Sequence, residues 1–390
     1  MLSRILQKSG FQVCESGSER ETCPENVFFL DETFIRHYYP IAKLPQEHLS
    51  DLLAAAARIG ANREKRESSW FLHRGLCAEN TEISRSFPEL LTGWNDDSGC
   101  LCLLLALALI PAYEKRAEME NYPLRYAHAA ASRIGVMPLR YAMKYPGRFG
   151  AKPESLLFML NFLHRPMFRI GRFDFVLEQA GENFPHVYEN NGQFQLFCRD
   201  GWEMTAEGER AAPGEKGCWR ANFQDDGEFA AGTPVNVDTG LAEKRAIRVA
   251  RRDYAKWIEP GDWLLHFHIP AGGGMKPELC VESFREAFPF FQNHYPDRSV
   301  KLIFTDSWIG NPLWAECMPD SNLGRLIRSS MLFPSFAAPD AGLKFVFSGT
   351  DADFDSYPQS TELQRIMIRH LKAGGKLRSV GMLIPPAMYS

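Results

Sequence analysis

Hydrophobic residues in the first part of the chain recur at helical spacing. Between Pro45 and Gly60 the apolar positions fall three or four residues apart, so they share one face of a helix. Proline favours the first turn of a helix and glycine often follows the last turn. Pro45 and Gly60 therefore mark the expected start and end of this helix. Two further segments have the same apolar spacing between Pro or Gly residues: 123–135 and 153–166.

The longest apolar run, Cys100–Ala112, is also predicted to be helical. A helix that spans a membrane needs about 20 apolar residues, whereas this run is shorter and contains Pro111. We interpret it as a buried core helix and predict no membrane span. Together these segments predict an α-helical domain over residues 30–165, preceded by an irregular segment over residues 1–29.

After Pro166 the pattern changes to short runs in which every second residue is apolar. Such alternation is typical of β-strands with one buried face. Glycine-rich turns separate the runs, which predicts antiparallel hairpins, and the stretch 207–217 is expected to be a surface loop. The expected strands lie within 168–177, 193–198 and 218–223.

From about residue 243 onward the expected strands alternate with helices. This alternation favours a mixed α/β sheet domain. The fold class predicted for the whole chain is therefore α+β, a helical domain followed by a domain with a mixed, largely antiparallel sheet over residues 166–390. The expected elements are a strand at 263–269, a helix at 277–291, a strand at 300–305, a helix near 312–317 and a strand at 343–347.

Charge and cysteine content narrow the class of protein. The chain of 390 residues has 44 Lys and Arg against 48 Asp and Glu, a formal net charge of −4, which argues against a nucleic-acid-binding protein. Its nine cysteines include no Cys-x-x-Cys pair, and no apolar stretch of signal-peptide length follows the first residues. We therefore expect reduced thiols and a cytoplasmic location.

The most informative segment is the one in which the strand 263–269 leads into three glycines and then into a helix with Pro277 in its first turn. Glycine lets the backbone approach a ligand closely, and the amide groups at a helix N-terminus favour an anion such as a phosphate. The candidate anion-binding residues are Ala271, Gly272, Gly273, Gly274 and Met275. The alternative is an ordinary glycine-rich turn, since the spacing of the known nucleotide loops is absent.

Two histidines in the same strand are candidate bases. The two-residue period of a strand places His266 and His268 on one face. Imidazole has a near-neutral pKa and is the usual proton acceptor in catalysis. The alternatives are hydrogen-bonded structural histidines, or a zinc site for which no third ligand is visible, so we expect no metal.

Polar residues follow the next expected strand. Asp306, Ser307 and Trp308 come at its end, and strand ends in α/β sheets often line binding sites. Asn311 and Asn322 each precede or open a short helix, where they are also ordinary cap and turn residues. No Gly-x-Ser-x-Gly or His-Glu-x-x-His motif is present, so the sequence does not support a serine hydrolase or a zinc protease.

Several motifs together resemble a bacterial family of acyltransferase-domain proteins. That family joins a helical N-acyltransferase-type N-terminal domain to a GNAT-like C-terminal domain, GNAT denoting the fold of acetyl-CoA-dependent N-acetyltransferases. The resemblance extends over roughly residues 30–390 and is strongest from 166 onward. The motifs that carry it are His268-Ile-Pro-Ala-Gly-Gly-Gly-Met, Ser307-Trp308, Ser321-Asn322-Leu-Gly and Leu371-Lys-Ala-Gly-Gly-Lys.

This resemblance implies an enzyme that transfers an acyl group from acetyl-CoA or another acyl-CoA to a small-molecule amine acceptor. It implies that the glycine loop holds the pyrophosphate of coenzyme A and that the acceptor amine attacks the thioester directly. The charge balance and the lack of a predicted membrane span lead us to expect neither nucleic acid nor a membrane as a partner. The implied roles are His266 or His268 as base, Ser307 as acid, Asn311 as a coenzyme A contact, and Asp306, Trp308 and Asn322 as substrate-lining residues.

Two features depart from the GNAT pattern. The loop reads Ala271-Gly-Gly-Gly-Met in place of Arg/Gln-x-x-Gly-x-Gly/Ala, and no Tyr follows Asn311 in the next helix, where the acid often lies. These departures motivate an alternative, a non-catalytic GNAT-like protein that binds a small ligand or a partner.

Overall fold

The structure is a computed structural model that describes residues 22–79, 81–94, 97–336, 342–347 and 353–389. The chain divides into two compact units. Unit 1 comprises Met1–Arg169 and Pro270–Gly272, and unit 2 comprises Ile170–Ile269 and Gly273–Ser390. The domain limits predicted above, 30–165 and 166–390, lie a few residues from this division, apart from the short loop segment. The predicted irregular segment 1–29 lies mostly outside the described residues.

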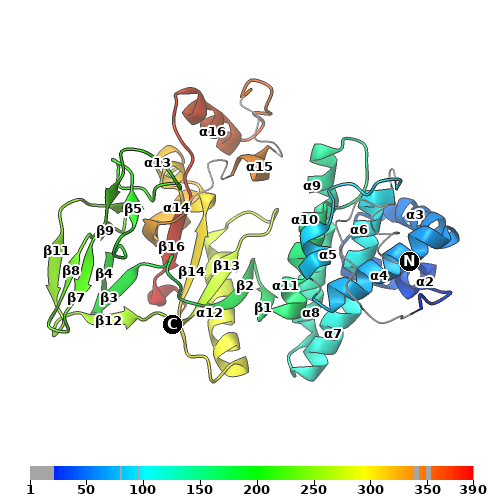
Figure 1. Cartoon of the computed structure of the whole chain (residues 1–390), viewed down its shortest axis with the longest axis horizontal. Coiled ribbons are helices and arrows are strands. Elements are labelled where there is room, and N and C mark those ends of the chain that lie inside the picture. Colours follow the sequence, from blue (N-terminus) through cyan, green and yellow to red (C-terminus); the bar gives the residue numbers. More distant parts are fainter. Residues whose placement is uncertain (1–21, 80, 95–96, 337–341, 348–352, 390) are drawn as a thin grey trace. The chain divides into compact units, whose positions relative to one another are not determined.

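The described part of unit 1 contains α-helices and short 3-10 turns up to the first residues of strand β1 (Figure 1). The three predicted helical segments are confirmed, although Ser132–Val136 continues as a 3-10 turn. The α-helices are α2 (Glu32–Ile41), α3 (Leu49–Ala61), α4 (Arg63–Cys77), α5 (Thr81–Ser86), α6 (Asp97–Ala108), α7 (Ile110–Met119), α8 (Leu124–Ala131), α9 (Met137–Lys144), α10 (Pro153–Met159) and α11 (Asn161–His164).

Helix α6 forms the core of unit 1, because every one of its residues is buried. Helices α6 and α7 together, Asp97–Met119, are long and apolar enough to cross a membrane by length and composition, but 83% of the apolar window is buried inside the structure. The burial agrees with the interpretation of this run as a core helix. Asp97 at its start is held by Arg58 at 2.7 Å and Lys65 at 3.0 Å, which compensates the buried carboxylate.

A six-stranded sheet organises unit 2, in the order β1-β2-β13-β14-β16-β15. Neighbouring strands for which a register is given are antiparallel, except β13 and β14, which are parallel. This mixed, largely antiparallel sheet confirms the predicted fold class. Its strands are β1 (Met167–Ile170), β2 (Phe173–Gln179), β13 (Trp263–His268), β14 (Val300–Ser307), β15 (Met331–Pro334) and β16 (Val380–Ile384).

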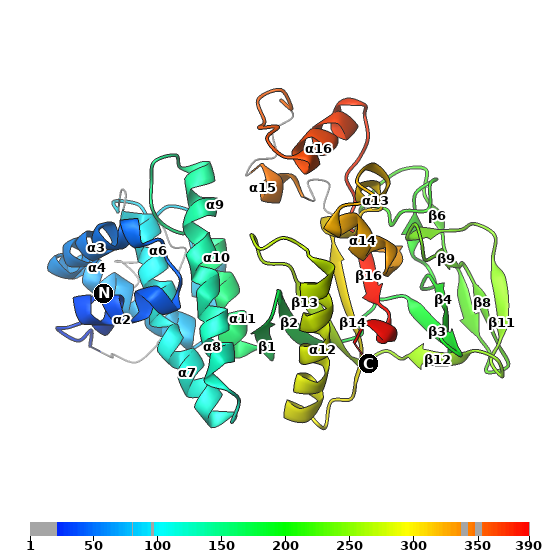
Figure 2. The same cartoon turned by 180° about the vertical axis from the view of Figure 1, so that it is seen from behind.

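Helix α12 (Pro277–His294) covers one face of this sheet. Phe284 of the helix stacks on Phe173 with ring centroids 5.2 Å apart and contacts Phe267 at 5.3 Å. These rings are fully buried, so they anchor the helix on the sheet. In both views α12 lies along β13 and β14 (Figures 1 and 2).

Residues 180–262, between β2 and β13, form an inserted β layer that covers part of the opposite face. One hydrophobic cluster joins Val187 and Leu196 of this layer to Leu264, Leu302 and Leu383 of the sheet. The layer therefore shares its core with the sheet. Its strands are β3 (His186–Asn190), β4 (Gln193–Phe197), β5 (Glu203–Met204), β6 (Trp219–Arg220), β7 (Phe223–Asp225), β8 (Phe229–Gly232), β9 (Val235–Asn236), β10 (Leu241–Ala242), β11 (Ile247–Ala250) and β12 (Ala255–Ile258).

Two local predictions were wrong. The stretch 343–347, expected to be a strand, contains the short helix α15 (Leu343–Val346), in which the buried residues Leu343 and Phe347 are four apart, the spacing of one helix face. The stretch 218–223 is not one strand, because two separate short strands, β6 and β7, occupy it. The remaining helices of unit 2 are α13 (Leu313–Cys317), α14 (Asn322–Arg328) and α16 (Glu362–Lys372).

Candidate active site at the carboxyl ends of the parallel strands

The two parallel strands separate near their carboxyl ends. Pairing between β13 and β14 stops at His266 and Phe304. Beyond this point β13 still pairs with β2 as far as His268, and β14 still pairs with β16 as far as Ser307. The backbone groups that face the gap between the two strands are therefore available to an extended ligand.

His266 lies between two carboxylates at this point. Its Nδ1 is 3.1 Å from Glu178 Oε1 on β2, and its Nε2 is 3.2 Å from Asp306 Oδ1 on β14. The ring stacks on Phe304 with centroids 4.6 Å apart, and 13% of the side chain is exposed. Ser335 donates a hydrogen bond of 3.1 Å to the second oxygen of Asp306. The imidazole is thus fixed in both position and orientation.

These contacts determine the charge of His266. Burial alone would lower its pKa, but the contacts with Asp306 and Glu178 outweigh burial and raise the pKa from 6.5 to about 9. For Asp306, partial burial would raise the pKa, but the contact with His266 lowers it overall. At neutral pH the site therefore holds an imidazolium against the Asp306 carboxylate, with Glu178 at its other ring nitrogen.

This geometry does not favour His266 as the base. A general base must be unprotonated at the working pH, whereas His266 is protonated and both of its ring nitrogens face carboxylates. The sequence left the base open between His266 and His268, and the geometry favours His268 for that role. His266 is better described as the cation that holds Glu178 and Asp306 in place.

His268 lies next to His266, with ring centroids 4.5 Å apart. The register of β13 with β2 places Asp174 directly opposite His268. Side chains directly opposite in an antiparallel pair lie on the same face, about 4.5–5.5 Å apart at Cβ. Asp174 is fully buried, so the register places a buried carboxylate on the same face of the sheet as the imidazole at the strand end. A carboxylate in such a position can orient a histidine base.

Ser307, the predicted acid, is not brought together with the histidines. The pairing of His266 with Phe304 puts Phe304 and Asp306 on the histidine face of the sheet, so the alternation of the strand puts Ser307 on the opposite face. Its hydroxyl accepts a hydrogen bond of 3.4 Å from the backbone of Ile309 and caps the following 3-10 turn. Ser307 therefore caps this turn, and its hydroxyl lies on the face of the sheet opposite to His268.

The other predicted residues of this region occupy structural positions. Asn311 is 4% exposed; its Nδ2 donates to the Arg378 carbonyl at 3.3 Å and its Oδ1 accepts from Leu313 at 3.0 Å. The Trp308 carbonyl accepts a 2.9 Å hydrogen bond from Trp314. Asn322 begins α14 directly after its cap. Of the predicted polar set, only Asp306 joins the histidines.

The glycine loop has the backbone conformation that only glycine adopts easily. Gly272, Gly273 and Gly274 have φ values of 77°, 74° and 65°, three successive left-handed residues. Arg172, in the turn between β1 and β2, donates a 2.6 Å hydrogen bond from Nε to the carbonyl of Gly274. A Cβ atom at Gly273 would lie 3.5–3.7 Å from the Arg172 side chain. A guanidinium therefore lies against the loop.

Helix α12 begins directly after this loop and presents an anion-binding end. Lys276 at its N-cap makes no side-chain capping hydrogen bond, and Pro277 occupies the first turn. The first free amides of this 18-residue helix therefore remain available, and the helix dipole favours negative charge there. Together with Arg172, the loop and helix form a site suited to a phosphate or pyrophosphate.

Several residues of the site were missed by the sequence reasoning: Asp174, Glu178, Arg172 and Ser335. Asp174 and Glu178 are four apart in a strand and so share a face, a signal that was present in the segment Phe173–Gln179. That this face meets the histidines depends on pairing across more than 80 residues of chain, which no local pattern shows. Among the described residues, no group of three or more His, Cys, Asp and Glu side chains could hold a metal ion.

The fold and this site define the class of protein. Residues 167–383, more than half of the chain, match the family described as GNAT-like C-terminal domain, and the chain belongs to that family. The resemblance stated from the motifs is confirmed.

Solved structures share this fold over almost the whole chain. An acyltransferase in complex with decanoyl-CoA and teicoplanin is similar with a TM-score of 0.60 at 18% identity, covering 98% of this chain and 93% of that chain. A mutant acyltransferase in complex with octanoyl-CoA gives 0.61 at 18% identity, and an acyltransferase with CoA and 10C-teicoplanin gives 0.59 at 17%, both with the same coverage. No curated protein matches the chain. The protein thus has the fold of these acyltransferases.

Proposed function

We propose that this protein is an acyl-CoA-dependent N-acyltransferase, which transfers an acyl group to an amine of a small-molecule acceptor. The observation that carries the proposal is the continuous unit of β13, three left-handed glycines and the uncapped start of α12, next to the point where β13 and β14 separate. This unit offers an anion site for the pyrophosphate and free strand backbone for the extended arm of coenzyme A.

The residues beside this unit supply the remaining chemistry. His268, oriented by Asp174, removes the proton from the attacking amine. Asp306, whose side chain is 43% exposed, accepts a hydrogen bond from the amine before attack. His266 lowers the pKa of Asp306 and holds the side chains of Asp306 and Glu178 in place. The leaving thiolate takes a proton from solvent or from the acceptor, since Ser307 lies on the other face of the sheet.

The similar structures support a proposal about the length of the acyl group. Those structures carry decanoyl-CoA and octanoyl-CoA, and two include teicoplanin or its 10C form. We propose that this chain likewise accepts an acyl group longer than acetyl, and that its acceptor is a small amine-bearing molecule in the cytoplasm. If an acyl chain is bound, each methylene that becomes buried adds about 0.8 kcal/mol to the binding free energy, up to about fourfold in Kd.

Calorimetric titration of the full chain with CoA, acetyl-CoA, octanoyl-CoA and decanoyl-CoA tests this proposal. Gly273→Glu places a negative charge in the loop, and Gly273→Gln adds similar bulk without the charge. Gly214→Glu is the matched control, because Gly214 has a similar φ of 79° and open space around it but lies in the inserted layer. We expect Gly273→Glu to abolish binding, Gly273→Gln to weaken it less, and Gly214→Glu to leave it unchanged.

Two results would overturn the proposal. If neither CoA nor an acyl-CoA binds to the wild-type protein, the alternative of a non-catalytic protein for a different ligand takes its place. If acyl-CoA binds but Gly273→Glu and Gly214→Glu behave alike, coenzyme A does not use the glycine loop. An acceptor screen that monitors release of the free CoA thiol then separates an enzyme from a CoA-binding protein.

A further inference from the structure

A second cavity lies in unit 2, away from the candidate active site. It has a volume of 460 Å³, within the range of about 300–1,000 Å³ that small-molecule sites occupy. It is lined by Lys301, the second residue of β14, and by Pro386, just after β16. This is the amino end of β14, so Lys301 lies five positions, about 17 Å of strand, from Asp306.

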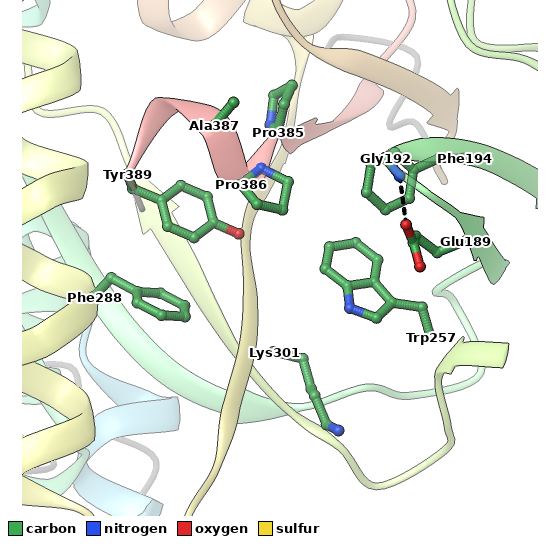
Figure 3. A pocket seen from close by; sticks show the side chains of 10 residues that line it. All are labelled: Glu189, Gly192, Phe194, Trp257, Phe288, Lys301, Pro385, Pro386, Ala387 and Tyr389. Carbon is green, nitrogen blue, oxygen red and sulfur yellow. Dashed lines mark hydrogen bonds between the residues drawn. The ribbon is translucent and has the colours of Figure 1, made fainter. Parts of the chain in front are cut away.

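Two pairs of aromatic side chains form the walls of this cavity. Phe194 of β4 and Trp257 of β12 pack with ring centroids 4.7 Å apart, and Phe288 of α12 packs against Tyr389 at the same separation. Figure 3 shows the two pairs on opposite sides of the space, with Pro385 and Pro386 above it. Such walls accept a flat or chain-like apolar body.

One buried polar atom of the wall has little hydrogen bonding. Tyr389 is 6% exposed, and its hydroxyl points into the space between the aromatic pairs (Figure 3). The backbone of Ile303 interacts with this oxygen, but no hydrogen bond of ordinary geometry satisfies it within the described residues. A buried hydroxyl gains from a well-aligned partner, so this atom favours a polar ligand group or an ordered water beside it.

The charged residues of the cavity indicate the sign of the ligand. Glu189 is already used, since its Oε1 accepts a 2.5 Å hydrogen bond from the backbone of Gly192 in the β3–β4 turn. Lys301 lines the same cavity, and no hydrogen bond or ion pair joins its ammonium to a described residue. Of the two, the Lys301 ammonium is the charged group with no partner among the described residues, so it is the group with which a ligand can pair.

From the aromatic walls, the Tyr389 hydroxyl and the Lys301 ammonium, we propose that this cavity is a binding site for a small apolar carboxylate, separate from the site of acyl transfer. The carboxylate pairs with Lys301, the apolar body lies between the two aromatic pairs, and the Tyr389 hydroxyl donates to a polar atom of the ligand. Since all lining residues belong to unit 2, the site does not depend on how the two units are arranged.

Three probes of one shape test the charge preference on the full chain: 4-phenylbutyrate, the neutral 4-phenylbutanol and the cationic 4-phenylbutylamine, each titrated by calorimetry. We expect the carboxylate to bind most tightly. Lys301→Met should weaken carboxylate binding about tenfold, as expected for a hydrogen bond with a charged group, and leave the alcohol unchanged. Lys216→Met, an exposed lysine of the inserted layer, should change neither, and Tyr389→Phe should weaken the carboxylate without loss of the fold.

The same titrations contain the outcomes that overturn the proposal. The proposal is contradicted if none of the three probes binds, or if the amine binds more tightly than the carboxylate. It is also contradicted if Lys301→Met weakens binding of the alcohol and of the carboxylate equally. The titration is repeated with saturating CoA, and displacement of 4-phenylbutyrate by CoA would place the probe in the proposed active site instead. Because CoA binding is measured separately, failure here leaves the proposed acyltransferase function untouched.

Discussion

Replacement of His266 by Gln should change how the stability of the protein depends on pH. In the wild type the imidazole lies between Glu178 and Asp306, and its pKa is about 9 in the folded protein against 6.5 ordinarily. One pKa unit corresponds to about 1.4 kcal/mol, so this shift amounts to about 3 kcal/mol in favour of the folded state. Glutamine keeps a donor and similar bulk but removes the charge.

The direction follows from the raised pKa. The contribution of His266 is fully present below pH 6.5 and is lost as the pH rises through about 9. Asp306 has a lowered pKa, so its contribution is present above its ordinary value of 3.8 and is lost only as the pH falls below that value. Buried thiols such as Cys198 and Cys280, whose pKa values burial raises, also contribute to the slope at alkaline pH, but equally in wild type and mutant. The difference between the two slopes therefore reports on His266.

The assay is the free energy of unfolding in urea, measured from about pH 6 to about pH 9.5 for the transition of unit 2. The wild type should lose about 3 kcal/mol more than His266→Gln over this range. His370→Gln, a partly exposed histidine on α16, is the control and should follow the wild type. Parallel curves for wild type and His266→Gln would refute the argument that the two carboxylates hold an imidazolium here.

Four further outcomes follow from the same region. His268→Ala should lower turnover roughly a hundredfold while CoA affinity in calorimetry stays unchanged, and Asp174→Asn should lower kcat and shift the pH–rate profile with little change in KM. Ser307→Ala should show no measurable loss of turnover in the thiol-release assay, because the side chain lies on the other face of the sheet. Asn311→Ala should cost about 1–3 kcal/mol of unfolding free energy in urea without weakening CoA binding, since its amide bonds only to protein groups.

The elements that the sequence predicted well are those with strong local signals. Helix α12 has a proline at its start, an apolar face and a long run, and the strand before it is a short, mostly apolar segment that leads into the glycines, so the unit of strand, glycine loop and helix was evident. The short stretch 343–347 was misassigned because five residues with four apolar side chains fit either period, and only burial at positions four apart decides for a helix.

The candidate site was predicted in part, because its residues come from strands that meet only in the fold. The two histidines and Asp306 stand out in the sequence as polar residues in or after apolar strands. Their partner Glu178 does not, since it precedes His266 by 88 residues and meets it only through the pairing of β2 with β13. The charge of His266 depends on that partner, so the sequence identified the residue but did not determine its protonation state.

The inserted layer has a consequence for how unit 2 folds. Strands β2 and β13 are neighbours, yet the whole layer separates them in the chain, so a simple hairpin cannot form between them. The ends of the layer are tied together, however: Ala180 donates to the Asp262 carbonyl at 2.8 Å, and Gly261 donates to the Ala180 carbonyl at 3.1 Å. Once folded, the layer acts as a tight turn and removes most of the entropy cost of closing so long a loop. The strands that carry His266 and Asp174 then pair fastest when the β layer folds first. Mutations in that layer would therefore slow formation of the active site even where they change none of its residues.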